Sequence, residues 1–325
     1  MVCLVNNHRL NSIKEFVIKV NLDVSIIIIS WNTHDLLLNC LTSLIGHTTS
    51  SRYEIFVVDN ASSDGSAAMV YENFPQVHII ENLENVGFAR ANNQAIIQAT
   101  GRYILFLNSD TVLKPYALDE LVTFMDEHPE AGAAGARLRN PDGTLQSSCY
   151  PRPTLIRESM RMFHLDKIWP NGSYHMAEWE QDMPREVDVL QGACVILRMK
   201  ALEKTGLLDE RFFFYSEDVD LCFRLQKAGY HLCWVPKAEV IHYGGQSSQL
   251  AADETFLSLY QCKLLYMRKH YGRLSSLVYK LILLIASLSR VLLAPFTLIE
   301  HPSLRQRHLT LAVRYLRLLV SLPGM

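Results

Sequence analysis

The chain of 325 residues has no paired cysteines, no excess of one charge and no apolar leader. Its seven cysteines are scattered without a C-x-x-C pair, which excludes a zinc ribbon and is typical of reduced core residues in a cytoplasmic protein. The formal net charge of −2 gives no support to general nucleic-acid binding. Asn6, His8 and Arg9 stand where a secretory signal needs an apolar core, so we expect a cytoplasmic protein.

Apolar residues make up 49% of the chain, enough for a sizeable core, and the length allows one large α/β domain plus an appendage. In the first half, apolar runs alternate with leucine-rich helical spacing. We expect strands at residues 24–30, 54–58, 77–80 and 103–107, each followed by a helix, at residues 35–45, 67–74, 87–99 and 116–127. This alternation predicts βαβ units and a mostly parallel sheet flanked by helices.

Regularity is weaker in the second half. We expect strands at residues 131–138, 187–198, 232–235 and 238–243, and helices at residues 200–205 and 217–228. Pro236 separates the last two strands. Residues 147–186 hold four prolines, two tryptophans and no clear period, which is typical of a functional or mobile loop.

Asn108, Ser109 and Asp110 follow the apolar run of residues 103–107 directly. The carboxyl end of a parallel strand is where ligands bind in open α/β sheets. A carboxylate there can hold a divalent cation, and a cation can hold a diphosphate. The alternative is a simple turn, since Asn, Ser and Asp are also turn residues.

Asp59 follows the strand at residues 54–58 and is therefore expected at the same edge of the sheet as Asp110. Its carboxylate can accept a hydrogen bond from the imide N–H of a uracil or thymine ring. The same loop can also cap the next helix through Asp64 or Ser66. The two interpretations are compatible.

The junction before the helix at residues 87–99 carries Asn85, Gly87 and Arg90. Gly87 permits close backbone approach, and Arg90 can meet a phosphate or the ribose of a nucleotide. The same pattern also fits a surface arginine beside asparagines that satisfy backbone groups.

A second acidic cluster, Glu217, Asp218 and Asp220, opens the helix at residues 217–228. Acids at a helix start complement the helix dipole, which is the structural alternative. The phenylalanines at residues 212–214 form an apolar wall, and a desolvated carboxylate can serve as a general base. Helical spacing puts Glu217 and Asp220 on one face and turns Asp218 elsewhere, so Asp218 is the candidate base. Arg224 is expected to pair with Asp220.

His242 ends the strand at residues 238–243, next to two glycines that allow close backbone approach. A lone histidine is more often a packing or surface residue. Imidazole nevertheless suits a borderline cation such as manganese. Asp110 and His242 could therefore hold one metal ion from two parts of the chain.

Together these pieces resemble the family 2 glycosyltransferases with the GT-A fold, and among them the bacterial rhamnosyltransferase-type enzymes of polysaccharide assembly. The matching segments run in family order: Ser30-Trp31-Asn32, residues 57–66, 85–89, 107–110, 192–194 and 213–220, and His242. Each segment is short, and the specificity comes from the ordered set.

The resemblance implies that Asp59 contacts the nucleotide base, that Asp110 and His242 hold Mg²⁺ or Mn²⁺ against the diphosphate, and that Asp218 is the base. It assigns to the donor side Ser30, Asn32, Asn85, Gly87, Arg90, Asn108 and Ser109, and to the acceptor side Gly192, Glu217 and Trp179. The family's metal motif is commonly Asp-x-Asp, whereas this chain has Asn108 at its first position.

The expected reaction is a single displacement that inverts the anomeric carbon, with dTDP-rhamnose as the expected donor and a glycan or polyprenyl-linked saccharide as acceptor. No Ser-His-Asp or Cys-His arrangement competes with it. Two other functions remain open. A nucleotidyltransferase would usually show a Gly-rich basic loop after the first strand, which residues 30–35 lack. A non-catalytic nucleotide-sugar-binding scaffold is favoured only by Asn108.

We divide the chain into an N-terminal extension (residues 1–23), a GT-A domain (24–250) and a helical, membrane-associating region (251–325). Residues 277–299 are apolar, but Lys280 and Arg290 would be costly in a spanning helix. Residues 304–322 set four arginines among leucines, a pattern typical of an interfacial helix on anionic lipid. A peripheral position on the cytoplasmic face of the inner membrane fits; core-packing or oligomer-forming helices are the alternative.

Overall fold

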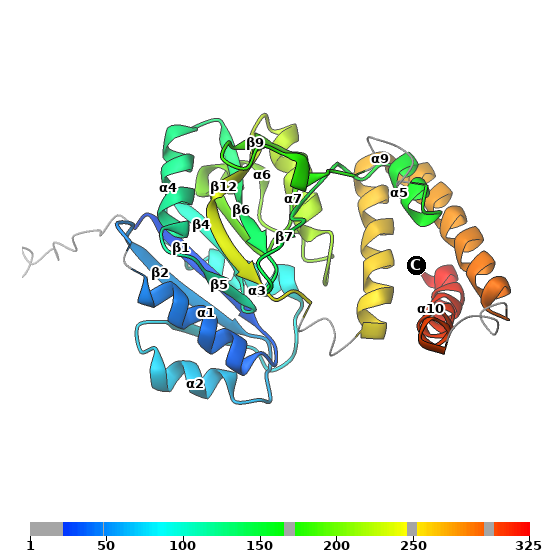
Figure 1. Cartoon of the computed structure of the whole chain (residues 1–325), viewed down its shortest axis with the longest axis horizontal. Coiled ribbons are helices and arrows are strands. Elements are labelled where there is room, and N and C mark those ends of the chain that lie inside the picture. The colour runs from blue at the N-terminus through cyan, green and yellow to red at the C-terminus, as the bar shows by residue number, and fades with distance from the viewer. Residues whose placement is uncertain (1–21, 48, 166–172, 246–251, 296–301) are drawn as a thin grey trace, which may run out of the picture.

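The computed structural model describes residues 22–47, 49–165, 173–245, 252–295 and 302–325. The predicted N-terminal extension lies outside these ranges except for its last two residues. One large sheet carries helices on both faces, and a separate helical lobe stands beside it (Figure 1).

The first half of the chain has the predicted βαβ order. Its elements are β1 (Val24–Ser30), α1 (His34–Gly46), β2 (Tyr53–Asp59), α2 (Ser66–Asn73), β3 (His78–Glu81), α3 (Phe88–Ile96), β4 (Tyr103–Asn108) and α4 (Ala117–Glu127). β1 lies between β2 and β4 and is parallel to both, and its isoleucines are almost all buried. Strands covered on both faces show such continuous apolar runs, which is why these elements are predictable.

Beyond β4 the sheet becomes mixed, in the order β3-β2-β1-β4-β11-β6-β12-β5. β11 (Cys194–Arg198) runs antiparallel to both β4 and β6 (Ala131–Arg139). β12 (His231–His242) is parallel to β6, and β5 (Thr111–Leu113) is antiparallel to β12. The sequence analysis missed β5, because three residues are too few to show a period.

The two strands predicted at residues 232–235 and 238–243 form a single strand, β12. Pro236 does not end β12; the register slips between Val235 and Glu239, and the strand continues to His242. A bulge lets the ladder pass a proline that has no N–H to donate. The predicted strand at residues 187–198 is instead two strands, β10 (Val189–Leu190) and β11, separated by a turn.

The prediction of an aperiodic loop at residues 147–186 was partly wrong, and residues 166–172 lie outside the described ranges. The described part contains β8 (Cys149–Tyr150), α5 (Leu155–Met162), η1 (Met176–Glu178) and β9 (Arg185–Glu186). Thr154 caps α5 by accepting a hydrogen bond from the Arg157 N–H. Just before this stretch, β7 (Leu145–Gln146) pairs with β6.

Two helices complete the sheet domain, α6 (Met199–Thr205) and α7 (Glu217–Lys227). The helical lobe consists mainly of α9 (Ala252–Leu293), which is bent at Gly272, and α10 (Pro302–Ser321), followed by η3 (Leu322–Gly324). α9 begins one residue inside the predicted helical region of residues 251–325, and its first half lies between the sheet domain and the rest of the lobe (Figure 1). By length and composition α9 is long and apolar enough to cross a membrane.

Candidate active site

The carboxyl ends of β1, β2 and β4 meet at one edge of the sheet. In the strand register Ser30 lies opposite Asp59, and Ile29 lies opposite Asn108. This edge therefore brings together residues that are far apart in the sequence, as expected for parallel strands.

An open cleft of about 440 Å³ begins at this edge. Among the predicted site residues it is lined by Asn85, Gly87, Asn108, Ser109, Asp110, Gly192, Glu217 and Asp218. Predicted donor-side residues and predicted acceptor-side residues therefore line the same cleft.

Asp110 and His242 meet because of β5. Thr111 of β5 pairs with His242 of β12, and the Tyr243 N–H donates to the Asp110 carbonyl at 3.0 Å. His242 Nε2 then lies 3.3 Å from Asp110 Oδ1 and 3.4 Å from Asn108 Nδ2. Both side chains are buried; Asp110 lines the cleft, whereas His242 is not among the lining residues.

This pair can contribute to a cation site. One carboxylate oxygen and one imidazole nitrogen converge, and no third His, Cys, Asp or Glu joins them in the described part of the chain. Mg²⁺ and Mn²⁺ commonly use few protein ligands and complete their shells with substrate phosphates and water. The donor set fits an ion of that kind.

Asp59 is 3% exposed and is not among the residues that line the cleft, although the next residue, Asn60, is. Asp59 Oδ2 accepts a hydrogen bond from the Ser62 N–H at 2.9 Å, whereas its buried Oδ1 makes no hydrogen bond within the described residues. A buried acceptor without a donor is costly. This oxygen is suited to a ligand N–H. Asp64 accepts a hydrogen bond from the Ser66 N–H at 3.1 Å, but the N-cap of α2 is Gly65, so neither Asp64 nor Ser66 is the N-cap that the capping alternative predicted.

Asn60 and Asn85 belong to an amide network at the same edge. Asn60 Nδ2 donates to Asn85 Oδ1 at 3.2 Å, and Asn82 donates to Asn60 at 3.0 Å. Asn82 and Gln94 also exchange hydrogen bonds. Asn60 lines the cleft but was not among the predicted residues.

Gly87 is required by a contact within the protein. Its φ is +84°, and an added Cβ would lie 2.6 Å from the Phe213 carbonyl oxygen and 2.8 Å from the Phe213 ring. The Phe88 N–H donates to that same carbonyl at 2.8 Å. The close approach expected at Gly87 is therefore made by the loop before α7.

Glu217 and Asp218 both line the cleft, which corrects the expected pairing of Glu217 with Asp220 on one face. Tyr215 and Ser216 have positive φ values, +75° and +67°, so α7 begins from a strained turn rather than a regular helix. This start turns the first two carboxylates together toward the cleft.

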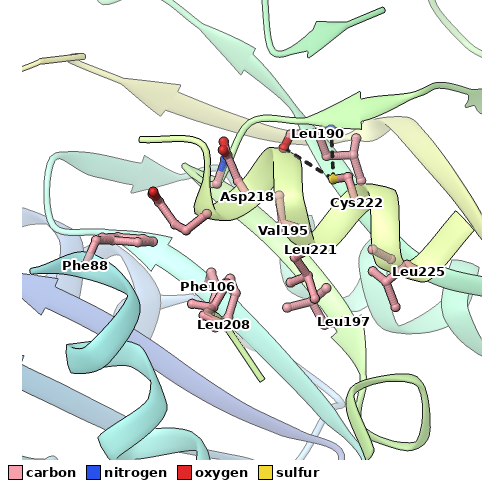
Figure 2. Close-up of a pocket in the computed structure, with 13 residues that line it drawn as sticks. Phe88, Phe106, Leu190, Val195, Leu197, Leu208, Asp218, Leu221, Cys222 and Leu225 are labelled. Atoms are coloured by element: carbon pink, nitrogen blue, oxygen red, sulfur yellow. Dashed lines mark hydrogen bonds between the residues drawn. The ribbon is translucent and has the colours of Figure 1, made fainter. Parts of the chain in front are cut away.

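A small apolar cavity lies behind these carboxylates, lined by leucines and phenylalanines. Figure 2 shows Asp218 at its end, with Leu221 and Leu225 on the same helix and Phe106 across from them. Burial raises the pKa of Asp218, against the opposing effect of the Val219 and Gly192 N–H groups. Burial, together with the charge of Asp218, raises the pKa of Glu217 well above its usual range. The pair thus shares a strong tendency to keep one proton.

Asp220 faces α9 instead and is fully buried. Its carboxylate lies 2.8 Å from Arg224, as predicted, and also 2.6 Å from Lys269 Nζ and 2.7 Å from His270 Nε2. These contacts attach the start of α7 to α9.

Several predicted residues lie away from the cleft surface. Ser30 is buried and lies 3.0 Å from Thr33 Oγ1, and Asn32 accepts a hydrogen bond from the Ser63 N–H. Arg90 is exposed on α3 and is not among the lining residues. Trp179 packs edge-on against buried Trp234, with ring centroids 5.4 Å apart, rather than lining the cleft.

The first turns of α9 contribute a wall that the sequence analysis missed. Glu254, Thr255 and Ser258 line the cleft, and Ser258 Oγ donates to the Phe214 carbonyl at 3.1 Å. Nothing in the local sequence distinguishes these residues from other polar positions on a helix, so only the packing of α9 identifies them.

The mostly parallel sheet flanked by helices has the GT-A type of fold. The chain belongs to glycosyl transferase family 2: the model of that family, "Glycosyl transferase family 2", matches residues 25–206. It is a glycosyltransferase with a rhamnosyltransferase-like sequence.

Three comparisons illustrate the relationship. An N-acetylglucosaminyl-diphospho-decaprenol L-rhamnosyltransferase of Mycobacterium tuberculosis is 32% identical over 62% of this chain and 69% of its own length. Rhamnosyltransferase WbbL of Escherichia coli is 25% identical over 72% of this chain and 88% of its own. The structure of a Pyrobaculum calidifontis mannosyltransferase in complex with GDP-Man and Mn²⁺ superposes with a TM-score of 0.55 at 18% identity, covering 93% of this chain and 87% of that one.

Proposed function

We propose that the chain transfers a sugar, best assigned as L-rhamnose from dTDP-rhamnose, to a glycan or polyprenyl-linked saccharide in cell-surface polysaccharide assembly. The single observation that carries the proposal is one cleft lined by both Asp110 and Asp218. The rhamnosyltransferase names of two relatives support the sugar and the pathway class.

Donor binding is assigned to the edge of the sheet at β1, β2 and β4. The unpartnered, buried Oδ1 of Asp59 would accept the imide N–H of the nucleotide base. Asn60 and Asn85, held in their amide network, would face the nucleoside, with Ser109 and Asn108 beyond them. We keep Ser30, Asn32 and Arg90 as supporting residues of this edge.

Asp110 and His242 would hold Mg²⁺ or Mn²⁺, and the ion would neutralise charge on the leaving diphosphate. Asn108 replaces a possible carboxylate ligand, so Asp110 supplies the only anionic side chain of this donor set. We therefore expect the ion to bind more tightly with the diphosphate than alone.

Asp218 would remove the proton from the acceptor hydroxyl. The hydroxyl oxygen then bonds to the anomeric carbon as the bond to the diphosphate oxygen breaks, and the configuration inverts. Glu217, which burial keeps neutral, would leave the negative charge on Asp218. Gly192, whose N–H lies 3.4 Å from Asp218 Oδ2, helps orient the base on the acceptor side.

The helical lobe would hold the enzyme on the inner leaflet. One outward face of α9 is apolar along its second half and includes Leu274, Leu277, Leu281, Ile285 and Leu288, all exposed. Of the three cationic side chains in this segment, Arg273 is exposed next to the bend, whereas Lys280 donates to the Met325 carbonyl oxygen and Arg290 donates to the Met162 carbonyl. The outward face can therefore lie on lipid without burying the charges of Lys280 and Arg290. This supports the proposed division at residue 250.

The test is a thermal-shift comparison of UDP, dTDP, GDP and CMP, each with and without Mn²⁺. We expect dTDP with Mn²⁺ to raise the melting temperature most; a ligand at 100 times its Kd adds about 2.7 kcal/mol of stability. Asp59→Asn should lose the shift, and Asp35→Asn, an exposed control, should keep it. Absence of any nucleotide shift in folded protein would contradict the proposal and favour a scaffold role.

A further inference from the structure

Gln146 of β7 lies beside His242 on the side away from Asp110. His242 Nδ1 is 2.6 Å from Gln146 Oε1, while Gln146 Nε2 donates to the His242 carbonyl at 3.1 Å and to Asn140 Oδ1 at 2.8 Å. The amide nitrogen of Gln146 thus has two acceptors. Its oxygen is left to face the imidazole.

The orientation of this amide is set further along the turn at residues 140–144. Asp142 is exposed and ionised, since the hydrogen bond from Thr144 lowers its pKa, and a carboxylate can only accept. Thr144 Oγ1 therefore donates to Asp142, and accepts from Asn140 Nδ2 at 2.9 Å. Asn140 must then present its oxygen to Gln146, which is the arrangement observed.

In the series of hydrogen bonds from Asp142 to His242, the donor and the acceptor of every bond are therefore fixed. Gln146 Oε1 can only accept, so His242 Nδ1 carries the proton and Nε2 is left with a lone pair. Two groups face that Nε2: Asn108 Nδ2 at 3.4 Å, which can donate to it, and Asp110 Oδ1 at 3.3 Å, an acceptor that is compatible with the lone pair when a cation lies between them.

We infer that Gln146, oriented by the turn at residues 140–144, is a positioning residue that holds His242 in its Nδ1–H tautomer and aims the Nε2 lone pair at the site of Asp110. The inference rests on the proposed metal function of His242 and adds to it a residue outside the predicted site. A ligand histidine commonly donates its other N–H to such a partner, and losing that partner costs 10- to 100-fold in metal affinity.

The experiment uses the full chain and two measurements. Long-range ¹⁵N–¹H NMR at about pH 8 reads the tautomer of His242 without metal. Mn²⁺ affinity is measured by calorimetry in the presence of dTDP. We expect the wild type to show the Nδ1–H tautomer. Gln146→Leu should lose this preference and bind Mn²⁺ about 10- to 100-fold more weakly.

Gln146→Glu is the rescue variant, because its carboxylate still accepts from Nδ1 and should bind Mn²⁺ within a few-fold of the wild type. Gln226→Leu is the matched control: Gln226, on α7, also makes two hydrogen bonds, accepting one from Arg152 and donating one to the Val187 carbonyl, and neither involves His242. This variant should change neither the tautomer of His242 nor the affinity for Mn²⁺.

An Nε2–H tautomer in the wild type, or unchanged tautomer and affinity in Gln146→Leu, would overturn the inference. If the wild type binds no Mn²⁺, the metal proposal fails by itself, and the NMR reading still decides the role of Gln146.

Discussion

At the scale of single residues, the division of labour between Glu217 and Asp218 is the sharpest question. Glu217 is buried and Asp218 half-buried beside the same apolar cavity; burial raises the pKa of both carboxyls, and the charge of Asp218 also raises the pKa of Glu217. We therefore expect one group to stay neutral while the other ionises. Neighbouring carboxyls in low-dielectric surroundings commonly acquire different roles in this way.

We expect Asp218→Asn to lower the rate of transfer by about 10²- to 10⁴-fold, the usual contribution of a general base, and to leave nucleotide binding in place. Glu217→Gln replaces a neutral carboxyl by a neutral amide and should retain most of the activity. The measurement is initial rate of nucleoside diphosphate release with acceptor, together with the nucleotide thermal shift. Loss of activity in Glu217→Gln with an active Asp218→Asn would reverse the assignment.

Single residues also show why some predicted site residues lie at the expected edge of the sheet and others do not. Asp59 and Asp110 follow buried parallel strands, so their common edge could be predicted from the strand ends alone. Trp179 could not be placed by such reasoning. It lies in an irregular segment, and its packing against Trp234 depends on a distant strand.

At the scale of elements, the contact between α7 and α9 holds the carboxylate pair in position. Asp220 binds Arg224 on its own helix and Lys269 and His270 on α9, without access to water. Burial alone would raise the pKa of Asp220, but hydrogen bonds from His270 and Lys269, with the charge and hydrogen bond of Arg224, lower it below the usual value.

Asp220→Asn should reduce the free energy of unfolding by about 3 kcal/mol near neutral pH, because it leaves buried cations without their counter-charge. A carboxyl with a depressed folded-state pKa stabilises the protein above its unfolded pKa, about 3.9, and loses this effect as the pH falls. The difference between variant and wild type should therefore shrink below about pH 4. Urea unfolding at several pH values measures it.

Asp126→Asn is the matched control, since Asp126 also bonds an arginine, Arg102, but on the exposed surface. It should change the stability by less than about 1 kcal/mol. An equal loss of unfolding free energy in Asp220→Asn and Asp126→Asn would contradict the conclusion that the α7–α9 contact is the more stabilising of the two.

At the scale of the whole molecule, the lobe of α9 and α10 presents apolar side chains to the outside. α10 uses two of its arginines, Arg314 and Arg317, to bind Asp253 at the start of α9. These two ion pairs connect α10 to α9, so we expect α10 to attract anionic lipid less strongly than its four arginines would if none of them were paired.

We expect the wild type to sediment with phosphatidylglycerol vesicles, and the double change Leu277→Glu and Leu281→Glu to reduce binding at least 10-fold. Each of these exposed leucines loses about 1.5–3 kcal/mol of apolar contact with lipid. Leu83→Glu with Ile97→Glu, exposed positions of the sheet domain, is the control. If the wild type does not bind vesicles but forms a dimer, and the double variant is monomeric, the outward face of α9 is a self-association surface.

The sequence by itself determined the βα order, the strand-end acids and the family, because each depends on local periodicity or on residues that follow a buried strand. Only the tertiary structure decided that α9 walls the cleft through Glu254 and Ser258, and that Lys280 and Arg290 turn inward. It also decided that Gln146 faces His242. These contacts join residues separated by about 40 to 130 positions, and their partners are chosen by how whole elements pack, which no local pattern encodes.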